Sequence, residues 1–175
     1  CNRNCSFCAI PLIRGKHVSK SKEEIVNEVH FLAKQGVKEI ILIAQDLTWY
    51  GIDIYGKREL PDLINRISEV EGIEWIRLHY NYPANFPAGL LSVMHKNGKV
   101  CSYLDMPLQH ISNRILRSMK RGLGGSKTVD LINNIKSNMP NMALRTTLIV
   151  GYPGETEEEF EQLLVFVKQT RFDRL

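Results

Sequence analysis

The sequence lacks long hydrophobic runs, a signal-peptide pattern and a cysteine-rich framework. None of its apolar stretches, in a chain of 175 residues, approaches the ~18 residues that cross a bilayer, so no membrane segment is expected. Four cysteines without an export signal argue against a disulfide-stapled secreted domain. The sequence therefore predicts reduced thiols and a cytoplasmic location.

An excess of one charge is also missing. The chain carries 23 Lys and Arg against 19 Asp and Glu, for a net charge of +4. This balance is too mild to indicate nucleic-acid binding. Hydrophobic residues make up 43% and charged residues 24%, which is typical of a globular protein with a proper core. Because no long Pro, Gly or Ser linker and no internal repeat divides the chain, we expect one domain.

Helical and strand-like patterns alternate along the chain. Capping boxes at Ser21/Glu24 and Thr156/Glu159 mark two helix starts, and Pro61 marks another. The predicted helices cover 21–36, 61–72, 87–96, 112–120, 126–138 and 156–167. Short β-branched or apolar runs predict strands at 37–44, 73–80, 100–106 and 143–150.

This alternation predicts an α/β fold with a parallel sheet, outer helices and right-handed crossovers. Each predicted strand ends in a polar or glycine-containing stretch, where ligands of α/β sheets and barrels bind. Four strands are too few to close a barrel, so an open, partial TIM-type βα barrel is expected. We expect its first strand to be missing before Cys1, which would place the cysteine-containing loop on the same rim.

Three cysteines, Cys1, Cys5 and Cys8, have the spacing CxxxCxxC. Three thiolates hold three corners of an iron–sulfur cubane and leave the fourth iron open, which is the arrangement of a catalytic rather than a closed metal site. Two other interpretations stay open. The cysteines fit a zinc knuckle completed by His17 or Cys101, or they are small buried residues.

Three arginines are candidate anchors for carboxylates, because the guanidinium fork pairs with them bidentately. Arg14 follows the cysteines, and Arg121 ends a predicted helix, where a surface role is as reasonable. Arg145 lies within a predicted strand, on the same face as Thr147 and Ile149. We expect Arg145 to be buried and therefore paired.

CxxxCxxC before a βα array with a glycine-rich fourth strand end resembles the radical S-adenosylmethionine enzymes. The resemblance implies that Cys1, Cys5 and Cys8 hold a [4Fe–4S] cluster whose open iron binds S-adenosylmethionine. One electron then cleaves the sulfonium bond and yields a 5′-deoxyadenosyl radical. The cofactor supplies this chemistry, while the protein positions and shields it.

The resemblance also assigns cofactor-binding residues. Phe7 and Ile149 are expected to pack on the adenine, and Gly151 to let the ligand approach the backbone closely. The amide of Gln45 and the carboxylate of Asp46 suit the methionine ammonium group, although a turn or cap role for Asp46 is the plain alternative. Gln109 and Arg145 complete the predicted cofactor site.

Motifs spread over nearly the whole chain resemble the methylthiotransferases within this superfamily. They are CNRNCSFCAIP from Cys1, PLQH from Pro107, MKR from Met119 and IVGYPGET from Ile149. The family inserts a methylthio group at an unactivated C–H bond. AQDLTWYG from Ala44 and RLHYNYP from Arg77 look like the branch that modifies the β-carbon of an aspartate in a small-subunit ribosomal protein. A tRNA-adenosine methylthiotransferase is the first alternative, and a zinc-stabilised ribosome- or RNA-binding module is the second.

The chain also departs from the family pattern. Family members carry an N-terminal domain with cysteines for a second, auxiliary [4Fe–4S] cluster, and a C-terminal TRAM domain. Neither is expected within residues 1–175, which correspond to a partial radical core domain. The resemblance further implies a reductant such as flavodoxin or ferredoxin. We expect Cys101, the cysteine outside the motif, to be a buried strand residue.

Overall fold

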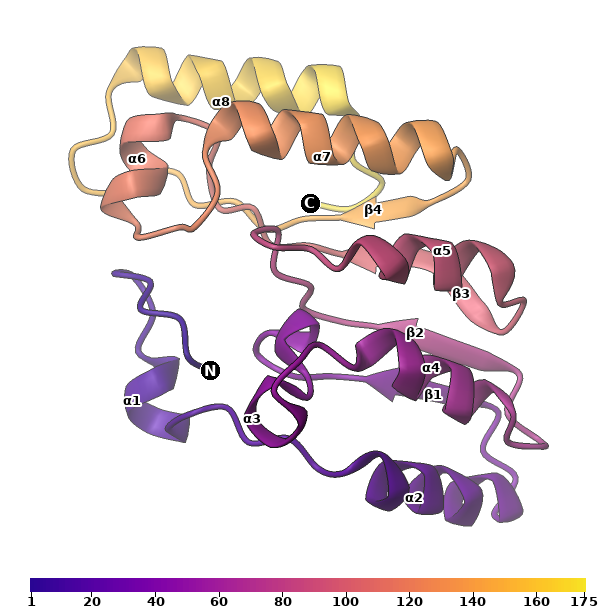
Figure 1. The fold of residues 1–175 in the computed structure, drawn as a ribbon. Coiled ribbons are helices and arrows are strands. Elements are labelled where there is room, and N and C mark those ends of the chain that lie inside the picture. Colours follow the sequence, from indigo (N-terminus) through magenta and orange to yellow (C-terminus); the bar gives the residue numbers. More distant parts are fainter. The chain divides into compact units, whose positions relative to one another are not determined.

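The computed structural model describes residues 1–175, apart from the side chain of Ala88. Four parallel strands form one open sheet in the order β1-β2-β3-β4, with helices between them (Figure 1). The strands are β1 (Glu39–Leu42), β2 (Trp75–Leu78), β3 (Val100–Asp105) and β4 (Ala143–Arg145). The predicted α/β fold with a partial, open barrel sheet is confirmed. All four strands are shorter than predicted: β1 and β2 lose residues at both ends, and β3 and β4 at their carboxyl ends.

The chain divides into two compact units. The first unit contains Cys1–Lys16, Tyr82–Asn85 and Leu104–Leu175, and the second contains His17–Asn81 and Phe86–Tyr103. Helices of the first unit are α1 (Ile10–Arg14), α6 (Asn113–Ser118), α7 (Gly125–Asn138) and α8 (Glu157–Thr170). Those of the second are α2 (Lys22–Lys34), η1 (Leu47–Trp49), α3 (Ile52–Tyr55), α4 (Leu60–Ser68) and α5 (Ala88–Lys96). The short helices α1, η1 and α3 were not predicted, since so few residues show no periodicity.

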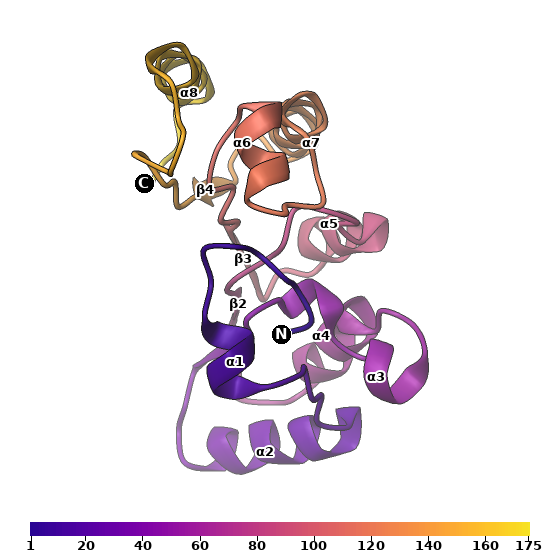
Figure 2. The same cartoon turned by 90° about the vertical axis from the view of Figure 1, so that its left-hand side faces the viewer.

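The second unit is built on the parallel pair β1 and β2, whose register joins Ile40 to Ile76. These two side chains are buried, whereas Ile41 and Trp75 on the opposite face are half exposed. Alternate residues of a strand point to opposite faces, so one face of this pair is covered and the other open. The apolar side of α4 is buried, and α4 and α5 lie next to each other in both views (Figures 1 and 2).

A buried ion pair fixes the start of α2 in the same unit. The predicted capping box at Ser21 and Glu24 is present. Lys22 Nζ lies 2.5 Å from Glu59 Oε2 and 2.6 Å from Asp62 Oδ2. A buried ammonium requires such partners, and this pair joins α2 to α4.

The first unit contains the strand ends that carry Gln109, Ile149 and Gly151, three of the predicted cofactor residues. Its core residues come from the end of β3, from α6, α7 and β4; they include Leu104, Met106, Leu108, Ile115, Leu116, Ile132, Ile135 and Leu144. The capping box of Thr156 and Glu159 opens α8 as predicted. Within this unit, α6 and α7 lie side by side in both views (Figures 1 and 2). No helix in the described part of the chain is long and apolar enough to span a bilayer.

Candidate functional site

Residues Cys1–Cys8, here called the cysteine loop, form a short irregular segment before α1. A turn at Ser6 and Phe7 brings the Cys8 amide to the Cys5 carbonyl at 3.2 Å. All three cysteines are unpaired and half-buried. Phe7 is 36% exposed, so its ring is not part of the core of this unit. The Phe7 ring is thus accessible to a ligand, and its role against the adenine stays a prediction.

Ser6 attaches the cysteine loop to two other segments of the first unit. Its amide donates to the Met119 carbonyl at 3.2 Å, and its hydroxyl donates to the Ser118 carbonyl at 2.8 Å. The same hydroxyl lies 2.9 Å from the hydroxyl of Tyr152. Hydrogen bonds from Ser118 and Ser6 lower the pKa of Tyr152. The end of α6 and the segment after β4 therefore both hold this loop, through contacts that are open to water.

Arg121 contacts the cysteine loop directly. Its Nη1 lies 3.7 Å from Cys5 Sγ, and its Nη2 donates to the Pro107 carbonyl at 2.6 Å. The guanidinium also stacks on the ring of Tyr82, 4.1 Å from the centroid. The hypothesis that Arg121 anchors a carboxylate stays a prediction. Arg14 lies at the exposed end of α1.

Gln109 and Ile149 pair across the strand ends. The Gln109 amide donates to the Thr147 carbonyl at 2.9 Å, and the Ile149 amide donates to the Gln109 carbonyl at 2.8 Å. Gln109 has φ 76°, a left-handed conformation that costs a non-glycine residue about 1–2 kcal/mol. Strained backbone of this kind occurs preferentially at functional sites. The structure thus brings Gln109 and Ile149 together, as the cofactor prediction requires.

Gly151 begins a turn that ends at Glu155, here called the glycine turn. Its φ of 70° favours glycine, and a Cβ added there would meet no protein atom within 4 Å. The turn itself therefore requires glycine for its backbone angle, and the space beside Gly151 is open. This open space is consistent with close approach of a ligand.

Glu155 organises the glycine turn, a role that the sequence analysis missed. Its Oε2 accepts hydrogen bonds from the amides of Gly151 at 2.5 Å and Tyr152 at 3.1 Å. Its Oε1 lies 3.0 Å from His110 Nε2. The Ser112 amide donates to His110 Nδ1, so we assign the ring proton to Nε2, which donates to Glu155. Both side chains are buried, at 0% exposure for His110 and 5% for Glu155.

This His110–Glu155 pair joins two of the motifs quoted from the sequence, PLQH and GYPGE. The sequence placed both residues at strand ends but gave no sign that they meet. Only the parallel arrangement of the two segments, with Gln109 bridged to Leu148, brings them together. Buried hydrogen-bonded networks make such a turn rigid before any ligand binds.

The prediction of a buried Arg145 is wrong, although the predicted partner exists. Its side chain is 37% exposed, and its Nη1 donates to Asp105 Oδ1 at 2.8 Å. Asp105 is fully buried, so the carboxylate rather than the guanidinium needs the pair. The sequence pattern missed Asp105 because it ends an apolar strand.

The two remaining predicted cofactor residues belong to the second unit. Gln45 is exposed, and Asp46 is buried at the start of η1. Asp46 Oδ1 accepts a hydrogen bond from the Thr48 hydroxyl at 2.6 Å. The turn role offered as the plain alternative is therefore present, and the role in binding an ammonium group stays a prediction.

The two candidates for a fourth zinc ligand also lie in the second unit. His17 Nε2 lies 3.2 Å from the Ser19 hydroxyl, and burial lowers the pKa of this histidine. Cys101 is half-buried in β3, where burial raises the pKa of its thiol. Cys101 is thus a strand residue as expected, but only partly buried.

The donor set of the cysteine loop fits an iron–sulfur cluster in its chemistry. Iron–sulfur clusters take cysteine thiolates, and three thiols without a disulfide lie within eight residues. The Arg121 cation contacts one of them, Cys5. The buried Arg121 Nε has no hydrogen-bond partner among the described atoms, so the guanidinium still has a donor to offer. Within the described residues, no three His, Cys, Asp or Glu side chains already form a metal-binding group.

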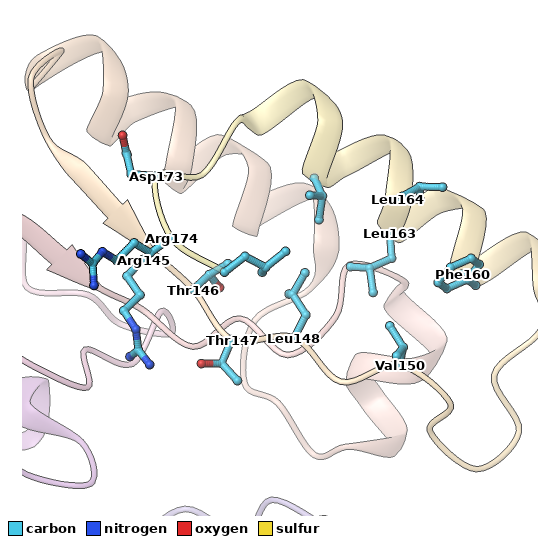
Figure 3. Close-up of a pocket in the computed structure, with 12 residues that line it drawn as sticks. Arg145, Thr146, Thr147, Leu148, Val150, Phe160, Leu163, Leu164, Asp173 and Arg174 are labelled. Carbon is cyan, nitrogen blue, oxygen red and sulfur yellow. The ribbon is translucent and has the colours of Figure 1, made fainter.

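A separate cavity of about 850 Å³ lies between the segment after β4 and α8 (Figure 3). Its wall is largely apolar and includes Leu148, Val150, Phe160, Leu163 and Leu164. Arg145 and Arg174 lie at one end of it (Figure 3). None of the cysteine-loop residues lines this cavity.

Known proteins resemble this chain along its whole length. It is 58% identical over 175 residues to the ribosomal protein uS12 methylthiotransferase RimO of Flavobacterium johnsoniae, and 55% identical to the protein of the same name from Bacteroides thetaiotaomicron. Both alignments cover 100% of this chain and 40% of the relative. The chain thus spans about two fifths of the length of these curated relatives.

Solved structures with low sequence identity share the fold. The radical S-adenosylmethionine methyltransferase TsrM from Kitasatospora setae, solved with cobalamin and a [4Fe–4S] cluster, matches with a TM-score of 0.72 at 16% identity, over 98% of this chain and 33% of TsrM. Coproporphyrinogen III oxidase (HemN) from Escherichia coli, a radical SAM enzyme, matches with a TM-score of 0.65 at 17% identity, over 99% of this chain and 40% of HemN. The model of the Radical SAM superfamily matches residues 1–167. With its three thiols in one loop and its glycine turn at a strand end, the chain belongs to the radical SAM superfamily.

Proposed function

We propose that this chain is the radical core of a methylthiotransferase that modifies ribosomal protein uS12. The observation that carries the proposal is the 58% identity to a RimO protein over the whole chain. The relatives are named for their action on uS12. Their name supports uS12 as the substrate of this protein. We expect the methylthio group to be inserted at the β-carbon of an aspartate in uS12.

In this proposal Cys1, Cys5 and Cys8 hold a [4Fe–4S] cluster. The cluster, when bound, supplies one electron for the reductive cleavage of S-adenosylmethionine. The chain leaves one iron free for the cofactor because the cysteine loop offers only three thiols. A small reductant protein, flavodoxin or ferredoxin, delivers the electron.

The glycine turn and the paired strand ends receive the nucleoside. The paired backbone of Gln109 and Ile149 lies at these strand ends, and the space beside Gly151 is open. The Glu155 carboxylate fixes the Gly151 amide. Phe7 packs on the adenine from the cysteine loop. Gln45 and Asp46 bind the methionine ammonium group.

The reaction replaces one C–H bond of the aspartate by a C–S bond. The hydrogen atom would leave as part of 5′-deoxyadenosine, and the electron released when the carbon radical forms the C–S bond would return to an iron–sulfur cluster. A second S-adenosylmethionine would give its methyl group to the sulfur and leave as S-adenosylhomocysteine. A second [4Fe–4S] cluster, in a part of the protein outside residues 1–175, is implicated in sulfur delivery. The protein shields these radical steps by position and exclusion of water.

The test uses the full-length protein, purified and reconstituted without oxygen. We expect reduction in the presence of S-adenosylmethionine to release 5′-deoxyadenosine, and uS12 from a deletion strain to gain the mass of one methylthio group. Cys101→Ala, a strand residue outside the cysteine loop, is the matched control and should retain both activities.

Two outcomes would replace the proposal. Methylthio loss from tRNA but not from uS12 in the deletion strain would favour the tRNA-adenosine enzyme. Zinc without iron in protein purified anaerobically would favour the zinc-stabilised binding module.

A further inference from the structure

Arg121 reaches the cysteine loop from a segment far away in the sequence. It follows α6, directly after Lys120, whose φ of 55° turns the backbone into the left-handed region. Arg121 Nη1 lies 3.7 Å from Cys5 Sγ, within the range of a hydrogen bond to sulfur. Through this contact a guanidinium group lies against one of the three cysteine sulfurs.

The guanidinium is fixed on two further sides. Nη2 donates to the Pro107 carbonyl at 2.6 Å, and the ring of Tyr82 lies 4.1 Å from the guanidinium carbon. Tyr82 is buried, and its hydroxyl accepts a hydrogen bond from the Gly122 amide at 3.2 Å. A cation on an aromatic face is stabilised electrostatically, more so when water is excluded. Arg121 is therefore held in one position before any ligand arrives.

The same ring also carries a residue of the cysteine loop. The guanidinium carbon of Arg3 lies 4.0 Å from the Tyr82 centroid. Two cations thus share one aromatic ring, one from the cysteine loop and one from the segment after α6. This arrangement places two guanidinium groups on the ring beside the cysteine loop.

None of the contacts that the structure gives for Arg121 is with a carboxylate. Its bonded partners are a carbonyl and a thiol, and its buried Nε has no hydrogen-bond partner among the described atoms. Glu159 and Asp105, carboxylates of the same unit, are paired with other arginines. Arg121 faces the Cys5 sulfur, the atom that would carry negative charge as a ligand of the cluster.

We propose that Arg121 is a positioning residue that sets the reduction potential of the cluster on the cysteine loop, by donating a hydrogen bond to Cys5 Sγ. The inference rests on the proposed function. Hydrogen bonds and positive charge at cluster sulfurs stabilise the reduced, more negative state and so raise the potential. Tyr82 acts through Arg121, by holding the guanidinium at the sulfur.

The experiment measures the midpoint potential of the full-length, reconstituted enzyme in a redox titration followed by electron paramagnetic resonance. The signal that changes when S-adenosylmethionine is added identifies the cluster on the cysteine loop and separates it from an auxiliary cluster. Arg121→Gln removes the charge and the fork, and Arg121→Lys retains the charge alone. Tyr82→Leu removes the ring, and Tyr82→Phe is its matched control.

We expect Arg121→Gln to lower the ratio of reduced to oxidised cluster at a fixed potential about tenfold, which corresponds to about 59 mV for a one-electron couple. Arg121→Lys and Tyr82→Leu should show smaller losses in the same direction, and Tyr82→Phe should match the wild type. An unchanged potential in Arg121→Gln, at full iron content, overturns the inference.

If Arg121→Gln cannot be loaded with iron, the Tyr82 pair decides. Equal potentials in Tyr82→Leu and Tyr82→Phe overturn the inference, and a lower potential in Tyr82→Leu alone supports it. Failure of the proposed function can be distinguished from failure of this inference. In that case the wild-type enzyme itself would release no 5′-deoxyadenosine.

Discussion

The cysteine loop and the glycine turn are both assigned to the same cofactor, but the protein holds them in opposite ways. The cysteine loop is attached through exposed hydroxyls of Ser6 and Tyr152 and through the Arg121 contact to Cys5. The glycine turn is held by a buried carboxylate, Glu155, and a fully buried histidine. The difference indicates that buried groups of the fold fix the turn, whereas contacts open to water hold the loop.

The largest effect on activity is expected for replacement of a proposed cluster ligand in the cysteine loop. Cys5→Ala in the full-length enzyme should reduce 5′-deoxyadenosine release to background, because two thiolates cannot hold a cubane with one open iron. Iron content and product release, measured together after anaerobic reconstitution, test this. Retained activity at full iron content would contradict the assignment of the cysteine loop.

The next effect tests the preorganised turn. Glu155→Gln should raise the KM for S-adenosylmethionine about tenfold, since loss of one charged hydrogen-bond acceptor costs about 1–2 kcal/mol. Iron content should stay near the wild-type value. The exposed Glu161→Gln on α8 is the control, and equal KM values for the two variants would show that the Glu155 network does not support the cofactor.

A third prediction concerns stability rather than activity. The Arg114 guanidinium, helped by the Ser112 hydroxyl and the Thr156 amide, lowers the pKa of Glu159 to about 2. Because the pKa is lower in the folded state, the stabilisation is present above the ordinary value of 4.5 and is lost as the pH falls towards 2.

Glu159→Gln should therefore lower the free energy of unfolding at neutral pH and make it less dependent on pH between about 5 and 2. Urea unfolding of the full-length protein at a series of pH values, followed by circular dichroism, measures this. Parallel curves for the variant and the wild type over that range would refute it.

The smallest effect is expected for the exposed hydroxyls that hold the cysteine loop. Tyr152→Phe removes the hydrogen bonds to Ser6 and Ser118. Their net contribution to stability is about 0.5–1 kcal/mol, because water can replace an exposed hydrogen bond. Iron content and the rate of 5′-deoxyadenosine release should change less than about threefold. A loss greater than tenfold would mean that the loop is preorganised as strongly as the turn.

Much of the fold was predictable because its signals are local. The capping boxes at Ser21 and Thr156 and the alternation of apolar runs placed the long helices and all four strands. Strand lengths were overestimated since pairing partners, not residue type, decide where a ladder ends. The short helices α1, η1 and α3 escaped because fewer than two turns carry no periodic pattern.

The site divides in the same way. The cysteine spacing and the GYPGE motif carried the family resemblance, and the predicted cluster and nucleoside residues follow from it. The pairs His110–Glu155, Arg145–Asp105 and Arg121–Cys5 join residues 40 or more positions apart, and no local pattern encodes them. Arg145 was expected to be buried from strand parity, yet its partner Asp105 is the buried member.

The sequence by itself predicted which groups would bind metal and nucleoside, since such a prediction depends on residue type and spacing within short motifs. Only the tertiary structure decided which polar groups hold those motifs in place. The parallel strand ends set Gln109 beside Leu148, and this pairing brings His110 to Glu155 and the Gly151 amide to a carboxylate. Non-local hydrogen bonds form only when folding brings distant backbone segments together. The residues that hold the motifs in place could therefore not be predicted from the sequence, whereas the candidate ligand residues within the motifs could.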